Sequence, residues 1–371
     1  MSREQIAKAK RIVIKVGSSS LTGKAGAELD PKSVDTLVDI VAAARKNGAE
    51  VCVVSSGAIA AGLSPLGLKS RPKDLATQQA AAAVGQGLLI HRYTESFARF
   101  NITASQILLT TQDVIRRSHY QNAQRTLYRL LALGVVPIIN ENDTVGTQEI
   151  RFGDNDRLAA LVSLLIGADL LILISDIDAL YDAPPSRQGA QRVSTVKSVD
   201  DIDDSTLGGA GTAGVGSGGM LTKVEAARIS TSAGIPMLLT SLEKASEALQ
   251  GKDFGTYFEA KPSKTNSRLL WLAHASTPTG RLIVDAGAVT ALIERGVSLL
   301  PAGVTAVEGE FSAGDAVEIA SQDGVVIARG LVAFDSEEIP QMLGRSTKDL
   351  AKELGPEYER ELIHRDALVL L

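Results

Sequence analysis

Two clusters of amide and carboxylate side chains stand near the middle of the sequence. The first, NEND at 140–143, directly follows 135–139, an apolar run typical of a fully buried strand. The second is GDND at 153–156. Carboxylates attract an ammonium group, while amides and backbone N–H groups bind a carboxylate. The two clusters together predict a site for a small zwitterion, because ligands of open α/β sheets bind beyond the carboxyl ends of the strands.

The same residues have a purely structural interpretation. Asx-rich segments are typical of turns and helix caps. Asp154 or Asn155 could cap a helix that begins near Arg157. Either cluster alone supports both interpretations equally, and the presence of both behind one strand favours a binding site.

A third candidate is the glycine-rich segment 208–219, which carries seven glycines in twelve positions. Glycine permits positive φ and a close approach of the backbone, and N–H groups at a helix N-terminus bind anions. The segment precedes Leu221-Thr222-Lys223 and a predicted helix. We interpret it as a phosphate-binding loop with Lys223 supplying positive charge, and a flexible linker is the alternative.

The elements that must position these residues alternate between strands and helices. Such alternation indicates parallel strands joined by right-handed crossovers, with helices on both faces of the sheet. Gly48 and Gly134 stand where helix C-termini favour glycine, and Gly85 could break a long helix. The predicted strands are 11–16, 51–54, 105–109, 135–139, 170–174 and 236–239, and the predicted helices are 31–47, 73–100, 121–133, 157–166 and 223–233.

The pattern of predicted secondary structure changes from about Gly280, where short β-prone runs alternate with Gly/Asp turns. Predicted strands are 281–284, 316–319, 325–328 and 331–334, with one helix at 287–295. The Ser-, Thr- and Pro-rich stretch before them predicts a linker. We therefore expect one domain at 1–262, a linker at 263–279 and a second domain at 280–371.

Composition excludes several classes of protein. The net charge of −5 gives no overall attraction to nucleic acid. The single cysteine, Cys52, lies in an apolar run and predicts a buried thiol rather than a disulfide or metal site. The apolar stretch 158–174 is divided by Gly167-Ala168-Asp169 into segments too short to span a bilayer. We expect a cytoplasmic protein without a membrane partner.

Six short motifs lie at predicted strand ends or helix starts: IKVGSS at 14–19, VSSGAIAAG at 54–62, INEND at 139–143, FGDND at 152–156, SDIDALY at 175–181 and GSGGMLTK at 216–223. Together they resemble the amino acid kinase family over essentially the whole chain. INEND, GDND and the GGM-x-TK loop are similar to those of its glutamate-phosphorylating members. The resemblance implies a three-layer αβα amino acid kinase fold with a mainly parallel sheet. It also implies ATP and Mg²⁺ as cofactors, L-glutamate as substrate and γ-glutamyl phosphate as product.

The resemblance also assigns roles to single residues. It places Lys15 and Lys223 on the transferring phosphoryl group, with Asp156 holding both lysines. Preorganised ammonium groups and Mg²⁺ offset the repulsion between nucleotide and acceptor carboxylate. The implied substrate ligands are Ser56, Gly57, Asp143, Asp154 and Asn155, and the implied nucleotide contacts are Lys15, Ser175, Asp176, Ser217, Gly218, Gly219, Met220, Leu221, Thr222 and Lys223.

Each role has a simpler alternative when the residue is taken alone. Lys15 at a strand end would more often be a solvated residue, and Ser56-Gly57 could be an ordinary strand-to-helix turn. No general base is required, since a carboxylate is already a nucleophile at pH 7. A site without histidine therefore suits this chemistry.

The pattern VDAGAVTALIERGVSLLPAGV at 284–304 resembles a PUA domain, a small β-barrel usually met in RNA-modifying enzymes. However, residues 278–371 contain eight Lys and Arg against sixteen Asp and Glu. Affinity for nucleic acid rests largely on basic groups that neutralise phosphates, so we expect no nucleic-acid partner.

We therefore expect an ATP-dependent glutamate kinase acting in the first step of proline biosynthesis. The family resemblance further implies feedback inhibition by proline and a homo-oligomer, a dimer or a tetramer. Two alternatives stay open: a sister kinase acting on aspartate or N-acetylglutamate, and an RNA-binding regulator with a vestigial kinase fold.

Overall fold

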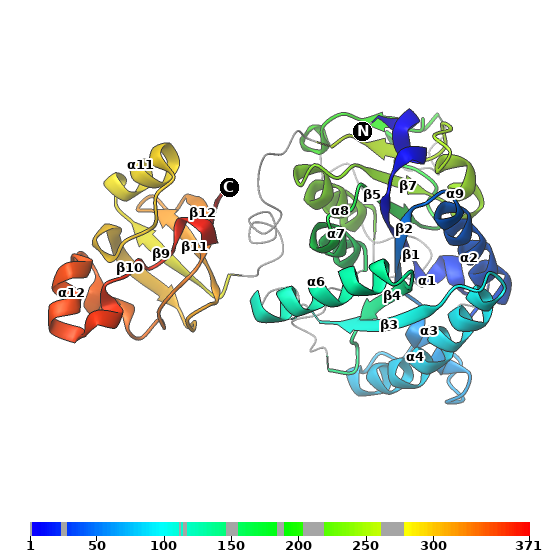
Figure 1. Cartoon of the computed structure of the whole chain (residues 1–371), viewed down its shortest axis with the longest axis horizontal. Coiled ribbons are helices and arrows are strands. Elements are labelled where there is room, and N and C mark those ends of the chain that lie inside the picture. The colour runs from blue at the N-terminus through cyan, green and yellow to red at the C-terminus, as the bar shows by residue number, and fades with distance from the viewer. Residues whose placement is uncertain are drawn as a thin grey trace. The chain divides into compact units, whose positions relative to one another are not determined.

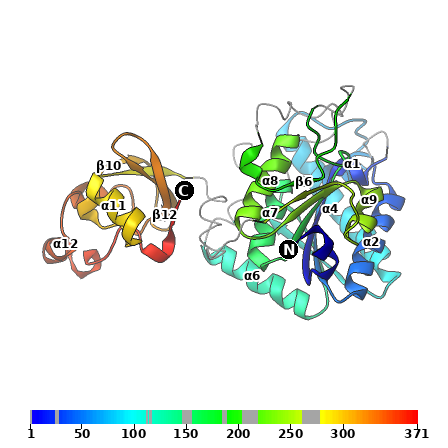
Figure 2. The same ribbon diagram turned by 90° about the horizontal axis from the view of Figure 1, so that it is seen from above.

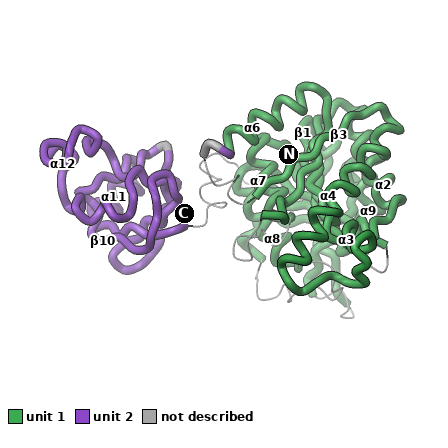
Figure 3. The backbone as a smooth tube through the Cα atoms, turned by 90° about the horizontal axis from the view of Figure 1, so that it is seen from below, with its two compact units in different colours: residues 1–114, 120–264 green, residues 115–119, 265–371 purple. Residues whose placement is uncertain are grey.

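The structure is a computed structural model that describes residues 2–23, 28–110, 113, 117–145, 155–183, 189–202, 219–260 and 278–371. The chain divides into two compact units, coloured separately in Figure 3. Unit 1 comprises residues 1–114 and 120–264, and unit 2 comprises residues 115–119 and 265–371. Each unit has its own cluster of buried apolar side chains.

Within the described part of unit 1, eight strands form one sheet in the order β3-β4-β2-β1-β5-β7-β8-β6. Neighbouring strands from β3 to β7 are parallel, and β8 runs antiparallel to β7. The strands are β1 Arg11–Val16, β2 Glu50–Ser55, β3 Ala104–Leu109, β4 Val136–Glu141, β5 Leu170–Ile174, β6 Thr195–Val196, β7 Met237–Thr240 and β8 Thr256–Phe258. The expected mainly parallel α/β sheet is confirmed.

Helices cover both faces of this sheet (Figure 1). Helices α2, α4 and α9 contribute to the core on one face, and α7 and α8 pack side by side on the other, as Figure 2 also shows. The described helices of unit 1 are η1 Arg3–Lys8, α1 Ser18–Leu21, α2 Pro31–Lys46, α3 Ala58–Leu63, α4 Leu75–Ala98, α6 Arg117–Ala132, α7 Asn155–Ile166, η2 Val199–Asp201, α8 Met220–Ser232 and α9 Leu242–Ala248.

The alternation of side chains along β1 determines where Lys15 lies. Successive side chains of a strand point to opposite faces of the sheet. Ile12, Ile14 and Val16 belong to the core that includes α2, α4 and α9. Lys15, one residue out of phase with them, therefore points to the face covered by α7 and α8. A lysine in this inner strand is thus buried between the sheet and two helices.

Gly85 does not break the long helix, contrary to the expectation from sequence. Helix α4 runs without interruption from Leu75 to Ala98. A Cβ on Gly85 would lie 1.7 Å from the carbonyl oxygen of Ala58, and a Cβ on Gly62 would lie 1.9 Å from that of Ala81. The two glycines are therefore required by the close crossing of α3 and α4.

Several predicted boundaries were wrong by a few residues, and three of them affect the site. Strand β4 continues through Asn140 and Glu141, both buried, instead of ending at 139. Helix α7 begins at Asn155 rather than 157, and α8 begins at Met220 rather than 223. An aspartate in the first turn is favoured by the helix dipole, so Asp156 suits the start of α7.

Unit 2 contains a smaller sheet in the order β10-β9-β11-β12-β13, with β9 and β11 parallel and the other pairs antiparallel. The predicted strand 331–334 was wrong, because β12 ends at Leu331 and the next backbone N–H, that of Val332, bonds to Asp315. Strands β10 and β13 and helix α12 were not predicted from the sequence. The bounds are β9 Gly280–Val284, α11 Ala286–Arg295, β10 Val304–Gly309, β11 Ala316–Ser321, β12 Val326–Leu331, α12 Thr347–Leu354 and β13 Leu368–Leu370.

Two smaller expectations concern the chain as a whole. Cys52 is a buried free thiol, as expected, and burial raises its pKa. In the described residues, no helix is both long enough and apolar enough to cross a membrane.

Candidate active site

A buried carboxylate bonded to two lysines occupies the centre of unit 1. Lys15 Nζ lies 2.5 Å from Asp156 Oδ1, and Lys223 Nζ lies 3.2 Å from Asp156 Oδ2. The side chains of Lys15, Asp156 and Lys223 are 5%, 0% and 4% exposed. We call these three residues the buried trio. A buried charge must be paired, and this carboxylate offsets two cations at once.

Three separate elements bring the buried trio together. Lys15 is the penultimate residue of β1, Asp156 lies in the first turn of α7, and Lys223 lies in the first turn of α8. Thr222 Oγ1 also lies 3.2 Å from Asp156 Oδ2, in addition to its shorter contact with Gly219 O. The trio therefore carries a net positive charge at the carboxyl end of β1, where an anionic ligand would be attracted.

A second polar group surrounds Asn155, the first residue of α7. Its Nδ2 lies within hydrogen-bond distance of Ser55 O at 3.0 Å, Ser56 Oγ at 2.8 Å and Asn140 Oδ1 at 3.0 Å. These partners come from the end of β2, the following turn and β4. Asn155 therefore bonds across to other elements rather than capping its own helix, and the capping alternative was wrong for this residue.

The oxygen of this amide, Asn155 Oδ1, is buried and has no hydrogen-bond partner in the part of the chain that the structure describes. Leaving a buried acceptor unpaired costs about 1–3 kcal/mol. A ligand ammonium group at this position would remove that cost.

Ser56 and Gly57 form the turn that follows β2. Ser56 Oγ accepts a hydrogen bond from Asn155, which leaves its own proton free to donate. Gly57 has a φ of +101°, a left-handed conformation that favours glycine. Asp143 lies in the turn directly after β4, the strand paired with β2. Asp154, also expected at this site, is outside the described residues.

Ser175 and Asp176 lie on the other side of β1, directly after β5. Ser175 is buried, and its Oγ donates to Asp176 Oδ1 at 2.9 Å. The Ser175 N–H bonds to Thr240 O at the end of β7, at 3.0 Å. These contacts fix a hydroxyl and a carboxylate at the carboxyl end of the sheet, in the region expected to bind nucleotide.

The predicted phosphate loop is described only in its last part. Gly219 is the N-cap of α8, and its carbonyl accepts from Thr222 Oγ1 at 2.9 Å. Met220 and Leu221 open the helix, and Leu221 is exposed. Ser217 and Gly218, like the rest of the glycine-rich segment before them, lie outside the described residues.

The strand order arranges these groups along one edge of the sheet. The sequence β4-β2-β1-β5 places the asparagine group on one side, the buried trio at β1, and Ser175 with Asp176 on the other side. The chain reverses its direction of progress across the sheet between β1 and β5, which is where open α/β sheets bind ligands. A small zwitterion and a larger anion could therefore lie on opposite sides of Lys15.

Asn140 belongs to the INEND motif but was not predicted as a site residue. Asn140 is buried at the end of β4, and its Oδ1 accepts from both Asn155 Nδ2 and the Glu141 N–H. The position of Asn140 at the carboxyl end of a predicted buried strand was the sequence feature that could have identified it as a site residue. The supporting Ser55 carried no comparable signal, because its contacts come from distant parts of the sequence.

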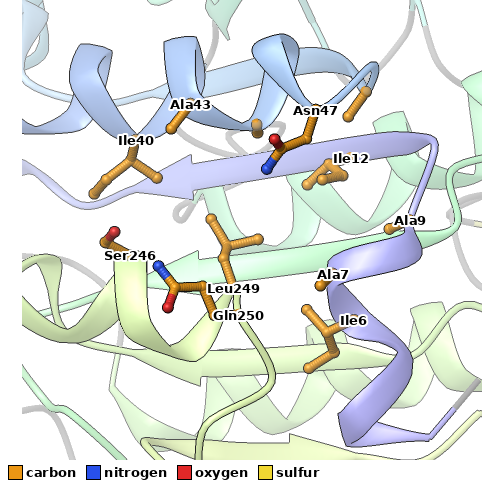
Figure 4. Close-up of a pocket in the computed structure, with 12 residues that line it drawn as sticks. Ile6, Ala7, Ala9, Ile12, Ile40, Ala43, Asn47, Ser246, Leu249 and Gln250 are labelled. Atoms are coloured by element: carbon orange, nitrogen blue, oxygen red, sulfur yellow. The ribbon is translucent and has the colours of Figure 1, made fainter.

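Figure 4 shows an apolar pocket that includes Ile12, near the start of β1. Lys15 lies near the other end of that strand. The walls of the pocket come from η1, the C-terminal part of α2 and α9, with Ile12 contributed by β1. None of the described residues that line it carries a charge. The pocket therefore lacks charged side chains to pair with an ammonium or a phosphate, and it is separate from the candidate active site.

A model of the amino acid kinase family matches residues 10–241, and a model of the PUA domain matches residues 280–354. The chain belongs to the amino acid kinase family. Among curated proteins it is 61% identical to "Glutamate 5-kinase" of Streptomyces avermitilis, covering 100% of this chain and 99% of that protein. It is 57% identical to "Glutamate 5-kinase" of Salinispora arenicola, covering 100% of both chains.

Solved structures agree on the fold. Carbamate kinase from Giardia lamblia bound to AMP-PNP is similar with a TM-score of 0.51 and 19% identity, covering 69% of this chain and 100% of that one. At this identity the likeness concerns the fold alone. The expected amino acid kinase fold, followed by a PUA domain, is thus confirmed.

Proposed function

We propose that this protein transfers the γ-phosphoryl group of ATP to the γ-carboxylate of L-glutamate, giving γ-glutamyl phosphate and ADP, the first step of proline biosynthesis. The observation that carries the proposal is the buried trio at the carboxyl end of β1, between a zwitterion-binding group and a nucleotide side. Relatives named glutamate 5-kinase that match over the full chain, two of them 61% and 57% identical, support this choice of reaction.

The trio supports phosphoryl transfer for an electrostatic reason. The attacking carboxylate and the triphosphate are both anionic, so their approach must be offset by fixed positive charge. Lys15 and Lys223 supply it, and Asp156 holds both ammonium groups in place before substrate arrives. Because the acceptor is already ionised at pH 7, no side chain is required to remove a proton.

Mg²⁺ accompanies ATP in this chemistry, and it shields the phosphate charge when bound. The described residues include no group of three or more His, Cys, Asp or Glu side chains that could hold a metal. Asp156 is bonded to two lysines and is therefore a poor candidate. This donor set suits a metal held chiefly by phosphate oxygens and water, as is usual for Mg²⁺ in nucleotide sites.

On the acceptor side, we assign the glutamate ammonium to Asp143 and the buried Asn155 Oδ1. Asp154 supports this ammonium-binding group, and the α-carboxylate is assigned to the Ser56 hydroxyl and the Gly57 N–H. On the nucleotide side we assign Ser175, Asp176 and the residues from Ser217 to Lys223. The unpaired acceptor on Asn155 and the available proton on Ser56 support the acceptor assignment.

We further propose that proline, the end product of the pathway, inhibits by occupying the same groups. Proline shares an ammonium and an α-carboxylate with glutamate, so protein groups that bind one amino acid can bind the other.

We also propose a catalytic domain at 1–262, a linker at 263–279, a PUA domain at 280–371, a homo-oligomeric assembly and a cytoplasmic location.

The reaction is tested by measuring ATP-dependent acyl hydroxamate formation with glutamate, aspartate and N-acetylglutamate in parallel. The expected result is turnover with glutamate far above the other two acceptors. Turnover with aspartate or N-acetylglutamate and none with glutamate would overturn the assignment. Absence of turnover with every acceptor would favour a vestigial kinase fold.

A further inference from the structure

A buried tyrosine is connected to the acceptor side through one serine. Tyr93 lies on α4, is completely buried, and its hydroxyl is 2.9 Å from Ser55 Oγ. Ser55 is also completely buried, and its Oγ donates to the carbonyl of Ser56 at 3.0 Å. A serine hydroxyl has one proton, so Tyr93 must be the donor in the first of these bonds. Burial raises the pKa of Tyr93, which keeps it protonated.

This chain of hydroxyls fixes one peptide group. The peptide between Ser56 and Gly57 is planar, so an anchored carbonyl directs the Gly57 N–H to the opposite side. That N–H donates no hydrogen bond within the described part of the chain. The Ser55 carbonyl is held as well, by Asn155 Nδ2 at 3.0 Å. The turn is thus held from α4 on one side and from α7 on the other.

We infer that Tyr93 is a positioning residue for the amino acid acceptor: through Ser55 it orients the Ser56–Gly57 peptide so that its N–H meets the acceptor α-carboxylate. Tyr93 itself touches no substrate, since it is completely buried beneath the turn. The inference rests on the proposed function for the identity of the acceptor. It predicts an effect confined to the acceptor side, because the hydroxyl chain does not reach Ser175 or α8.

The main test is Tyr93→Phe, which removes the hydroxyl and keeps the stacking of Tyr93 on Phe97. We expect the KM for glutamate to rise about threefold to tenfold, the range for losing one hydrogen bond. The KM for ATP should stay unchanged. Tyr257→Phe is the matched control, because Tyr257 is equally buried in unit 1 but lies on β8. It should change neither KM.

Ser55→Ala provides a second, independent route to the same result if Tyr93→Phe folds poorly. The double variant should be no worse than Ser55→Ala alone, because both changes interrupt one chain. An unchanged glutamate KM in Tyr93→Phe, an equal rise in both KM values, or additive effects in the double variant would each overturn the inference.

The wild-type protein is first assayed with glutamate, aspartate and N-acetylglutamate. This assay distinguishes a failure of the proposed function from a failure of the inference about Tyr93. If the wild type uses aspartate or N-acetylglutamate instead of glutamate, the proposed function fails. The variants are then compared with the acceptor that the wild type uses, and the same split between acceptor KM and ATP KM decides whether Tyr93 positions the turn.

Discussion

Carboxylates that lie between two cations occur in both units of the molecule, and one in unit 1 differs in burial from one in unit 2. In unit 1 the buried trio is at most 5% exposed. In unit 2, Glu318 on β11 lies 2.7 Å from Arg281 on β9 and 3.7 Å from Arg329 on β12. We call these three residues the surface trio, whose side chains are 19%, 36% and 23% exposed.

Both trios combine one negative and two positive charges, and their positions in the fold explain why we assign a catalytic role only to the buried trio. Arg281, Glu318 and Arg329 are directly opposite one another in the register of three adjacent strands, so the surface trio follows from strand pairing alone. Its side chains are partly exposed, so salt screens their charges more than those of the buried trio. The buried trio joins three elements that are distant in sequence, in a region where charges interact strongly and are costly to leave unpaired. Burial therefore decides which trio can serve catalysis.

The largest contrast is expected when the central carboxylate is neutralised. Asp156→Asn leaves two buried ammonium groups without their shared partner, and breaking a buried ion pair in this way costs about 3–5 kcal/mol of unfolding free energy. Urea denaturation of the variant and the wild type measures the difference. A loss as small as that of an exposed ion pair would show that the buried trio is not a structural unit.

Removing one cation should affect catalysis more than stability. Lys15→Ala or Lys223→Ala is expected to lower kcat by roughly a hundredfold or more, the scale for one preorganised transition-state contact. The affinity for ATP should fall less. Arg281→Ala in the surface trio is the counterpart and should leave kcat unchanged. A lysine variant with near-normal kcat would remove that residue from the catalytic assignment.

The asparagine group should give a smaller effect, limited to the amino acid ligands. Asp143→Ala and Asn155→Ala are each expected to raise the glutamate KM about tenfold or more, because each removes a hydrogen bond to a charged group. Proline inhibition should weaken in parallel, since proline presents the same groups. Asn47→Ala, in the apolar pocket at the other end of β1, is the control. Loss of proline sensitivity with an unchanged glutamate KM would indicate a separate regulatory site.

The sequence predicted the members of the buried trio better than their surroundings. Strand-end motifs placed Lys15 and Asp156 at the site, and the predicted strand 170–174 agrees with β5. The start of α8 was predicted three residues late, because a glycine-rich run before a helix does not reveal where the helix begins. The Tyr93–Ser55 contact joins residues 38 positions apart on different elements, so no local pattern could predict it. Strands β10 and β13 are edge strands, and helical segments separate each from the strand with which it pairs, so no hairpin turn marks them in the sequence.

A truncation tests whether the two trios are functionally independent. Protein ending at Thr279 should still phosphorylate glutamate, because every residue assigned to chemistry precedes Val224 and the two units have separate apolar cores. The kcat and glutamate KM of the truncated protein are compared with those of the full chain. Proline sensitivity and oligomeric state are measured alongside, since they can change independently. A folded truncation without kinase activity would contradict this independence.

The smallest effect is expected for Glu318→Gln in the surface trio. Exposed ion pairs contribute about 0–1 kcal/mol, so the unfolding free energy of the variant should change little, and its kinase constants should not change.

The informative measurement is binding to RNA. In the wild type, Glu318 neutralises two arginines of a region, residues 278–371, that has sixteen acidic and eight basic side chains. We therefore expect no RNA binding of physiological strength by the wild type. In the variant the negative charge that Glu318 presents to Arg281 and Arg329 is removed, while Glu308 still lies 3.9 Å from Arg281, so any gain in binding should be weak and should fall with salt. Tight, salt-sensitive binding by the wild type would show that another basic surface outweighs the acidic excess. Equal binding by the wild type and the variant would show that Glu318 does not mask the two arginines.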